Sequence, residues 1–292
     1  MFKGAITAIV TPFGENLNLD DESLKNLVEF QVKNKIDGIV PCGTTGESPT
    51  LSNEEHEKII KVVLENVNRK IPVIAGTGGN STKEVIEMTK HAANLGVNAS
   101  LQVCPYYNKP TQEGLYRHFS EIAKSVDIPI IIYNIQARTA VNLETSTLAR
   151  LAKEHSNIVG VKEASGNVAQ MMEVINELPR NFTVLSGDDN LTLPLMVLGG
   201  KGVISVASNI IPREMHDLTE LALNGNFEEA QKIHYKLLPL FKSIFIETNP
   251  IPIKAALAMK GMIKEIYRLP MCEMKQENKE KLRTILDKLK LL

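Results

Sequence analysis

Short apolar runs alternate along the chain with longer segments in which apolar residues recur at helical spacing. The runs are apolar at nearly every position and are bounded by Gly, Pro, Asn and Asp, which is typical of strands buried on both faces of a parallel sheet. We predict a strand in each of eight such runs: residues 4–12, 37–46, 71–79, 98–107, 128–135, 157–165, 182–189 and 202–209.

The segments between the runs have the periodicity of amphipathic helices. Two of them begin with the spacing of a capping box, in which a serine and a glutamate three residues later bond to each other's backbone N–H groups. The pairs are Ser52 with Glu55 and Ser81 with Glu84. From about Asn226 onward, helical periodicity continues without further strands.

Alternation of strands and helices predicts parallel strands joined by helical crossovers. Eight such units over about 225 residues match the size of a (β/α)8 barrel. We therefore expect an α/β fold, with a (β/α)8 TIM barrel carrying the catalytic site over residues 1–225 and a C-terminal helical appendage over residues 226–292. A doubly wound open sheet is the alternative, although GTGGNS at residues 76–81 is only a partial match to its glycine fingerprint.

Composition narrows the class of protein. The chain has 292 residues and a net charge of −1, so it has no field that would attract nucleic acid or an anionic membrane. No apolar run approaches the length of a membrane span, and the N-terminus lacks the pattern of a signal peptide. Three scattered cysteines are too few for a disulfide framework. We therefore expect a cytoplasmic protein that binds neither nucleic acid nor membranes.

Active sites of (β/α)8 barrels lie at the carboxyl ends of the strands, so the residues there are the candidates for chemistry. All six histidines fall in helical segments or at their ends, so we expect no metal centre at this rim. We interpret Asp188 and Asp189 as solvated turn or N-cap residues. The candidates are Gly43, Thr44, Thr45, Gly46, Glu47, Pro105, Tyr106, Tyr107, Asn108, Tyr133, Asn134, Arg138, Lys162, Gly187, Asp188, Ser205, Ala207 and Ser208.

Lys162 stands at the end of an otherwise apolar run. Alternation places Ile158, Gly160 and Lys162 on one face of the strand, and Val159 and Val161 on the other. If the first face is the barrel interior, Lys162 projects into the mouth, where desolvation lowers its pKa and the neutral amine can attack a ketone to form a Schiff base. Spacing alone leaves open the alternative of a structural lysine that snorkels to water or pairs with a carboxylate.

Tyr133 ends the neighbouring predicted strand, where its phenol could relay protons to and from a carbinolamine on the lysine. Thr44 could connect it to a second phenol, Tyr107. The alternative for each tyrosine is a rim residue whose hydroxyl bonds to a backbone group.

Several long motifs, in order along essentially the whole chain, resemble those of the dihydrodipicolinate synthase family of pyruvate-dependent class I aldolases. They include GTTGESPTLSNEEH, CPYYNKPTQEGLYRHF, GVKEASGN and NPIPIKAAL. The resemblance implies a lyase that condenses pyruvate with L-aspartate 4-semialdehyde to give 4-hydroxy-tetrahydrodipicolinate, in diaminopimelate and lysine biosynthesis. It also implies a homotetramer, a dimer of tight dimers, that needs no metal or organic cofactor.

The resemblance implies roles for eight residues. Lys162 would form the Schiff base with pyruvate, and Tyr133 would carry protons at that centre. Thr44 and Tyr107 would complete the relay, with Tyr107 supplied across a subunit interface. The substrate-binding residues would be Thr45 for the pyruvate carboxylate, Arg138 for the carboxylate of the second substrate, and Gly187 and Ile204, which would line the site through their backbones.

One loop departs from the family pattern, which has Val/Ile-Pro, a small residue and then Arg-Thr-Gly after Tyr-Asn. Here residues 135–140 read Ile-Gln-Ala-Arg-Thr-Ala. Loss of a Pro and a Gly changes the backbone shapes that this loop can adopt. Arg138 is retained, so the departure bears on the choice of second substrate more than on Schiff-base formation.

The resemblance also implies a hypothesis of feedback inhibition, in which lysine binds at the tight-dimer interface. His56 and Glu84 match lysine-sensitive members, whereas Asn53 and Pro49 replace a histidine and an alanine. A capping box with Ser81 would explain Glu84 without a ligand. The matching positions are Ser48, Pro49, Asn53, His56, Asn80, Glu84 and Tyr106.

Two other functions remain open. A class I aldolase for a sugar acid, such as N-acetylneuraminate or a 2-keto-3-deoxy acid, would share the lysine and tyrosine, but Arg138 and CPYYNKP argue against it. A non-catalytic pyruvate-binding barrel is the alternative from another class.

Overall fold

The computed structural model describes residues 2–292, and Met1, the first residue of the predicted barrel region, lies outside the described residues. All eight predicted strands are present. They are β1 (Gly4–Ala8), β2 (Gly38–Val40), β3 (Ile74–Gly76), β4 (Ala99–Val103), β5 (Ile130–Asn134), β6 (Ile158–Glu163), β7 (Thr183–Ser186) and β8 (Gly202–Ser205).

The eight parallel strands form one sheet with the order β2-β1-β8-β7-β6-β5-β4-β3. The ends of this order meet through a parallel bridge between Ile39 and Val73, where the Ile39 N–H donates to the Pro72 carbonyl at 3.0 Å. The sheet therefore closes on itself, which confirms the (β/α)8 barrel and excludes the open doubly wound sheet.

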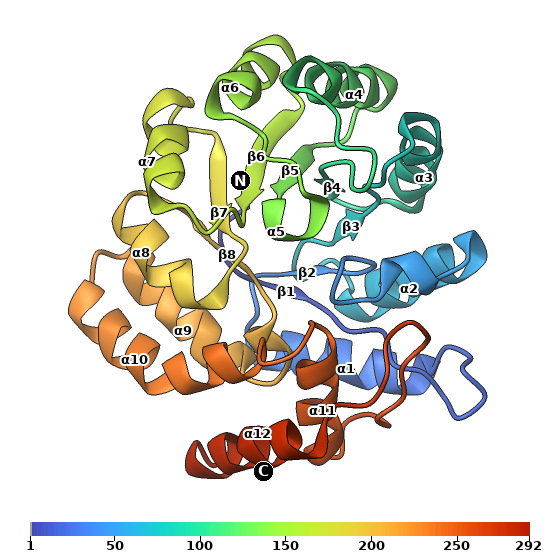
Figure 1. The fold of residues 1–292 in the computed structure, drawn as a ribbon, viewed down its shortest axis with the longest axis vertical. Helices are drawn as coiled ribbons and strands as arrows, with labels where there is room; N and C mark the ends of the chain where they lie inside the picture. Colours follow the sequence, from blue (N-terminus) through green and yellow to red (C-terminus); the bar gives the residue numbers. More distant parts are fainter. Residues whose placement is uncertain (1) are drawn as a thin grey trace.

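Helices surround the strands (Figure 1). The outer ring consists of α1 (Asp21–Lys33), α2 (Asn53–Val67), α3 (Thr82–Leu95), α4 (Gln112–Ser125), α6 (Thr145–Glu154), α7 (Val168–Glu177), α8 (Thr192–Val197) and α9 (Pro212–Leu223). Single turns lie at the carboxyl ends of strands: η1 (Ser48–Thr50), α5 (Gln136–Thr139), η2 (Asp189–Leu191) and η3 (Ala207–Asn209).

The C-terminal helices α10 (Phe227–Ser243), α11 (Ile251–Met259) and α12 (Gln276–Lys288) confirm the predicted helical region. They lie beside α1 and α9 along one side of the barrel (Figure 1). Leu282 and Leu286 of α12 belong to the same buried apolar cluster as Leu24 and Leu27 of α1. This region therefore shares its core with the barrel, and the boundary at residues 225/226 stays a prediction.

The two helix-capping predictions have different outcomes. The box at α2 is confirmed, because the Ser52 hydroxyl accepts from the Glu55 N–H at 3.2 Å and the Glu55 carboxylate accepts from the Ser52 N–H at 3.0 Å. The box at α3 is wrong, because the Ser81 side chain makes no capping hydrogen bond. Glu84 instead lines the groove between α2 and α3, so capping does not explain its presence.

The strand that carries Lys162 contains a bulge, which the alternation pattern did not predict. On β5, Ile130 pairs with Ile158 but the next residue pairs with Gly160, so Val159 is an extra residue on β6. Ile158 consequently packs under the helices, while Val159 packs against the barrel interior. The predicted shared face of Ile158 and Lys162 is therefore wrong, although Lys162 does face the interior.

Within residues 2–292, no helix combines the length and the apolar character that crossing a membrane requires.

Candidate active site

Lys162 and Tyr133 meet at the carboxyl ends of β6 and β5, where they pair in the sheet register. Lys162 is 5% exposed, and its Nζ lies 4.1 Å from the centroid of the Tyr133 ring. The Thr44 side chain, which follows β2, lies close enough to the Tyr133 hydroxyl to lower the pKa of that phenol. The structure therefore brings together three of the four predicted catalytic side chains.

Burial is the main influence on the Lys162 amine. Loss of water lowers its pKa to about 8, against the opposing effect of the carboxylates of Asp188 and Asp189, which raise it. An amine with this pKa is neutral in about a tenth of the molecules at pH 7, compared with well under a thousandth for an ordinary lysine. A neutral amine of this kind can act as a nucleophile at neutral pH.

Tyr133 has the opposite protonation state. Burial is the largest influence on its phenol and raises the pKa; Arg138 lowers the pKa, and smaller effects of Asp188 and Thr44 raise and lower it respectively. The phenol therefore stays protonated at neutral pH and can donate a proton to an oxygen that forms beside Lys162.

Asp188 and Asp189 differ from the sequence interpretation. Asp189 is 1% exposed, and its carboxylate accepts hydrogen bonds from the Ser205 hydroxyl at 2.5 Å and from the N–H groups of Val206 and Ala207 at 3.1 and 3.0 Å. Burial raises the pKa of both carboxyl groups. The interpretation as a solvated residue is wrong for Asp189, because the loop after β8 folds over it, whereas Asp188 is half-buried. Two adjacent carboxylates facing a buried lysine were the signal that sequence reasoning missed.

Two further candidates, Gly187 and Ile204, lie beside the lysine stem and in the barrel interior, respectively. A Cβ atom at Gly187 would lie 2.5 Å from the Ala164 Cβ and 3.1 Å from the Lys162 Cε, so only glycine lets this backbone pack on the lysine stem. Ile204 on β8 is fully buried among the side chains of the barrel interior.

Hydrogen bonds within the turn after β2, and from the C-terminal region, fix the conformation of this turn. Within the turn, the Glu47 N–H donates to the Thr44 carbonyl at 3.1 Å, and Glu47 has a left-handed backbone with φ of +55°. Outside it, the Asn249 side-chain amide donates to the Thr45 hydroxyl at 3.0 Å. Asn249 and the residues after it come from the C-terminal region, and the sequence analysis assigned them no part in the site.

Arg138 lies on α5 with an exposed side chain, and its guanidinium donates to the Asn249 carbonyl at 3.0 Å. Ala140, which ends this turn, has a left-handed backbone with φ of +58°. The chain thus adopts a glycine-like conformation at the position where the family pattern has Gly. Loss of that Gly has therefore left strain in the loop.

One cavity of about 310 Å³ joins two predicted sites. Its lining includes Thr44, Tyr133 and Arg138 from the candidate active site. It also includes all seven predicted lysine-binding residues, Ser48, Pro49, Asn53, His56, Asn80, Glu84 and Tyr106. Tyr107 is outside this lining; it is 89% exposed and has a left-handed backbone.

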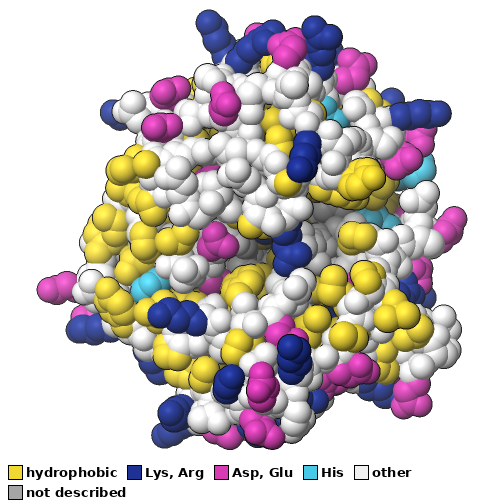
Figure 2. Space-filling model, in the orientation of Figure 1, with side chains coloured by type: hydrophobic (Ala, Val, Ile, Leu, Met, Phe, Trp, Pro, Cys, Tyr) yellow, Lys and Arg dark blue, Asp and Glu magenta, His cyan; other side chains and the backbone are white. Residues whose placement is uncertain are grey.

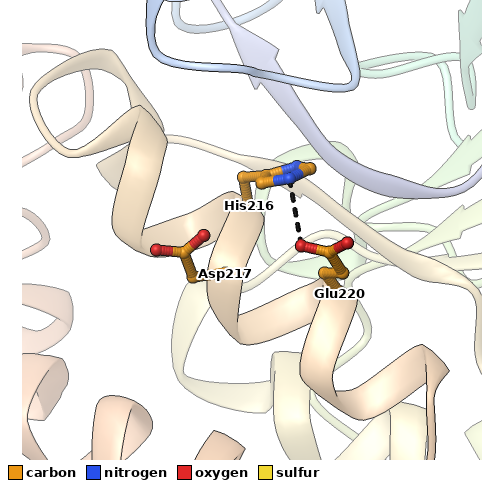
Figure 3. A group of neighbouring side chains, drawn as sticks. All are labelled: His216, Asp217 and Glu220. Atoms are coloured by element: carbon orange, nitrogen blue, oxygen red, sulfur yellow. Dashed lines mark ion pairs between the residues drawn. The ribbon is translucent and has the colours of Figure 1, made fainter.

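Histidine and carboxylate side chains that could share a metal ion come together in one group among the described residues, His216, Asp217 and Glu220 on α9 (Figure 3). His216 lies 3.1 Å from the carboxylate of Asp37, which also accepts the Ala5 N–H at the start of β1. The group therefore lies at the amino ends of the strands, far from the rim. Arg213 pairs with Asp217, so that carboxylate is already compensated.

Comparison with known proteins gives consistent matches over the full chain. The model of the Dihydrodipicolinate synthetase family matches residues 1–289. The chain is 54% identical over 292 residues to the 4-hydroxy-tetrahydrodipicolinate synthase of a Hydrogenobaculum species, with 100% of both chains covered. It is 56% identical to that of Thermodesulfovibrio yellowstonii, with 98% of each covered. The crystal structure of dihydrodipicolinate synthase from Aquifex aeolicus superposes with a TM-score of 0.98 at 53% identity, with 99% of each chain covered.

Ala140→Gly is expected to stabilise the protein. Glycine relieves a left-handed strain of about 1–2 kcal/mol but makes the unfolded chain more flexible, so the net gain in the free energy of unfolding should be about 0.5–1 kcal/mol. Ala137→Gly is the matched control, because Ala137 lies inside the same helical turn with an ordinary backbone, and it should lower stability. Urea unfolding of the two variants measures both effects, and a loss of stability in Ala140→Gly would contradict the assignment of strain.

Proposed function

The chain belongs to the dihydrodipicolinate synthetase family, and we propose that it is a lyase that condenses pyruvate with L-aspartate 4-semialdehyde to give 4-hydroxy-tetrahydrodipicolinate in lysine and diaminopimelate biosynthesis. The observation that carries the proposal is the buried amine of Lys162, with its pKa lowered to about 8, beside the protonated phenol of Tyr133.

In the proposed reaction, the neutral Lys162 amine attacks the keto carbon of pyruvate, and the keto oxygen leaves as water, which forms an iminium. The adjacent methyl carbon then loses a proton to give an enamine. This carbon attacks the aldehyde carbon of the second substrate, and the aldehyde oxygen takes up a proton to become the hydroxyl of the product. Finally, the amino group of the second substrate displaces the Lys162 amine and closes the ring, which regenerates the enzyme.

We assign the proton transfers to Tyr133, Thr44 and Tyr107. The protonated Tyr133 phenol donates to the oxygen that leaves as water, and Thr44, which lies near this phenol, lines the cavity with it. Tyr107 completes the relay from a neighbouring subunit. Its high exposure and left-handed backbone support this role, because strained residues cluster at functional sites.

Substrate carboxylates take two positions in this proposal. Thr45 holds the carboxylate of pyruvate, and Arg138, exposed at the mouth, binds that of the second substrate as a charge-assisted pair. Gly187 and Ile204 line the Schiff-base end of the site. The iminium is itself the electron sink, so the proposed chemistry requires no metal or organic cofactor. We also assign the enzyme to the cytoplasm.

Exposed apolar side chains support a homotetramer built as a dimer of tight dimers. One area surrounds Tyr107 at the mouth. A second consists of Val168 and Met172 on α7 and Val197 at the end of α8, which are 37%, 46% and 55% exposed. Yellow side chains gather over α7 and α8 in Figure 2. Two separate areas of this kind are what two distinct subunit interfaces need.

Borohydride reduction in the presence of pyruvate tests the covalent step. Mass spectrometry should find one pyruvate adduct on Lys162, which Lys162→Ala abolishes and which Lys201→Ala, at a lysine before β8, retains. In a coupled assay with both substrates, Tyr133→Phe should slow turnover by about 10²-fold or more, the usual size of a lost acid–base group.

The alternatives predict other outcomes of the same experiments. An inert pyruvate-binding barrel gives no adduct. A sugar-acid aldolase gives the adduct and cleaves a keto-deoxy acid, but does not turn over aspartate semialdehyde. Parent-like turnover in Tyr133→Phe would exclude the relay while leaving the lysine chemistry intact.

We also propose that lysine inhibits the enzyme by binding the cavity that reaches from Glu84 to Thr44 and Tyr133. Glu84 is free of a capping bond and can take an ammonium group. Burial lowers the pKa of His56, whose Nε2 lies 2.8 Å from the Gly76 carbonyl. A carbonyl only accepts, so this nitrogen carries the proton and Nδ1 is left as an acceptor.

Millimolar lysine should therefore lower the initial rate. Glu84→Gln should weaken this inhibition by about tenfold or more, because it removes a charged hydrogen-bond partner. Glu65→Gln is the matched control, because Glu65 is exposed on α2 and lines neither this cavity nor the adjoining groove, and it should leave inhibition unchanged. A rate and a melting temperature that do not respond to lysine would refute the proposal.

A further inference from the structure

Helix α11 carries a lysine that is sealed from water. Lys254 is 0% exposed, in a helix whose other buried residues are apolar or small, such as Ile253 and Ala255. Its Nζ donates to the Glu47 carboxylate at 2.5 Å and lies 4.5 Å from the centroid of the Phe13 ring. Burial lowers the pKa of Lys254, and Glu47 raises it.

A buried ion pair is a costly way to fill a core. Its two charges lose their hydration, and the attraction between them roughly offsets that loss, so apolar residues of similar volume are often as stable. What such a pair provides is a defined geometry, because each charge must keep its one partner. The pair therefore fixes where Glu47 lies.

Glu47 makes several of the hydrogen bonds that define the turn after β2. Its left-handed backbone directs its N–H to the Thr44 carbonyl at 3.1 Å. Its own carbonyl accepts from the N–H and the hydroxyl of Thr50 at 2.9 and 3.0 Å. The preceding residue, Gly46, accepts from the Thr11 hydroxyl at 2.7 Å. A displacement of Glu47 would therefore move the turn that carries Thr44 and Thr45.

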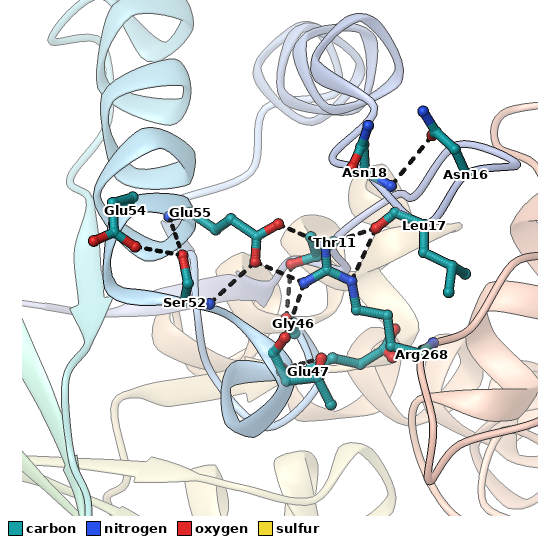
Figure 4. A network of polar contacts seen from close by, with 11 residues as sticks. Thr11, Asn16, Leu17, Asn18, Gly46, Glu47, Ser52, Glu54, Glu55 and Arg268 are labelled. Atoms are coloured by element: carbon teal, nitrogen blue, oxygen red, sulfur yellow. Dashed lines mark hydrogen bonds and ion pairs between the residues drawn. The ribbon is translucent and has the colours of Figure 1, made fainter.

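The segment after α11 holds the other end of this turn. The Arg268 N–H lies 3.5 Å from the second Glu47 carboxylate oxygen, and its guanidinium bonds to both carboxylate oxygens of Glu55 at 2.5 and 2.7 Å. It also donates to the Thr50 carbonyl at 2.8 Å and to the Leu17 carbonyl. Figure 4 shows these contacts converging on Arg268 from the turn, from the start of α2 and from the N-terminal loop.

We propose that Lys254 and Glu47 are positioning residues for pyruvate: the buried pair holds the Thr44–Thr45 turn in the shape that receives the pyruvate carboxylate. The C-terminal region then contributes to pyruvate binding, because it supplies Lys254. This inference rests on the proposed function, since it assumes that Thr45 takes that carboxylate.

Glu47→Asp tests the pair with both charges retained. The shorter side chain must pull the turn toward Lys254 to keep the pair, so the pyruvate concentration that half-saturates borohydride trapping should rise about tenfold, since small misplacements of binding groups have effects of this order. The KM for aspartate semialdehyde at saturating pyruvate should stay within about twofold of the parent. Lys264→Met is the matched control. Lys264 pairs with Glu15, so this ion pair also joins the C-terminal region to the barrel, but at the surface. The variant should change neither the half-saturating pyruvate concentration nor the KM for aspartate semialdehyde.

The double variant Lys254→Met/Glu47→Gln removes both charges, which lets the protein fold without a buried unpaired ion. It should show the same rise for pyruvate, with a melting temperature close to that of the parent. Parent-like half-saturation by pyruvate in either variant would overturn the proposal. Equal losses for both substrates would also overturn it, because they indicate general damage to the fold. If the parent itself forms no adduct, the proposed function fails, whereas an adduct in the parent with unchanged variants refutes only this inference.

Discussion

The Lys162 ammonium is held almost without water, and the site is arranged around that constraint. Because burial lowers the folded-state pKa from 10.5 to about 8, holding the charge costs about 3 kcal/mol. Because the folded-state pKa is the lower of the two, the charged form of Lys162 destabilises the folded protein. The cost is present in full below pH 8, decreases as pH rises, and is gone above the ordinary value of 10.5. In the proposed function, this lower stability at neutral pH accompanies an amine that is partly neutral and can react, and Asp188 and Asp189 limit how far the pKa falls.

The barrel supplies the enclosure that this requires. The bulge at Val159 adjusts β6 so that Lys162 faces the interior in register with Tyr133. Glycine at position 187 lets the neighbouring backbone cover the lysine stem. The C-terminal region closes the other side, through Asn249 on Thr45 and Lys254 on Glu47. The proposed nucleophile, proton carrier and carboxylate site thus come from parts of the chain that are distant in sequence.

Sequence patterns predicted the eight strands, the barrel, the C-terminal helices and the rim positions of Lys162, Tyr133 and Thr44, because these follow from local periodicity and one rule of barrel topology. They failed where the outcome depends on partners far along the chain. Glu47 and Lys254 are 207 residues apart, and Asp189 is buried by a loop from the next strand. The bulge depends on pairing with β5, and the predicted cap at Ser81 depends on a local geometry that spacing does not specify. The roles carried by Tyr107 and by the lysine-binding residues came from family resemblance and stay proposals.

A direct titration of Lys162 tests the central claim, that burial makes this amine reactive. NMR of the folded protein carrying isotope-labelled lysine, with the resonance assigned by its absence in Lys162→Ala, would give the pKa without any assumption about turnover. The structure predicts a midpoint near pH 8 for Lys162, with exposed lysines titrating near their ordinary value. A midpoint for Lys162 near 10.5 would contradict the account, because the amine would then be charged at neutral pH and its burial would have no catalytic effect.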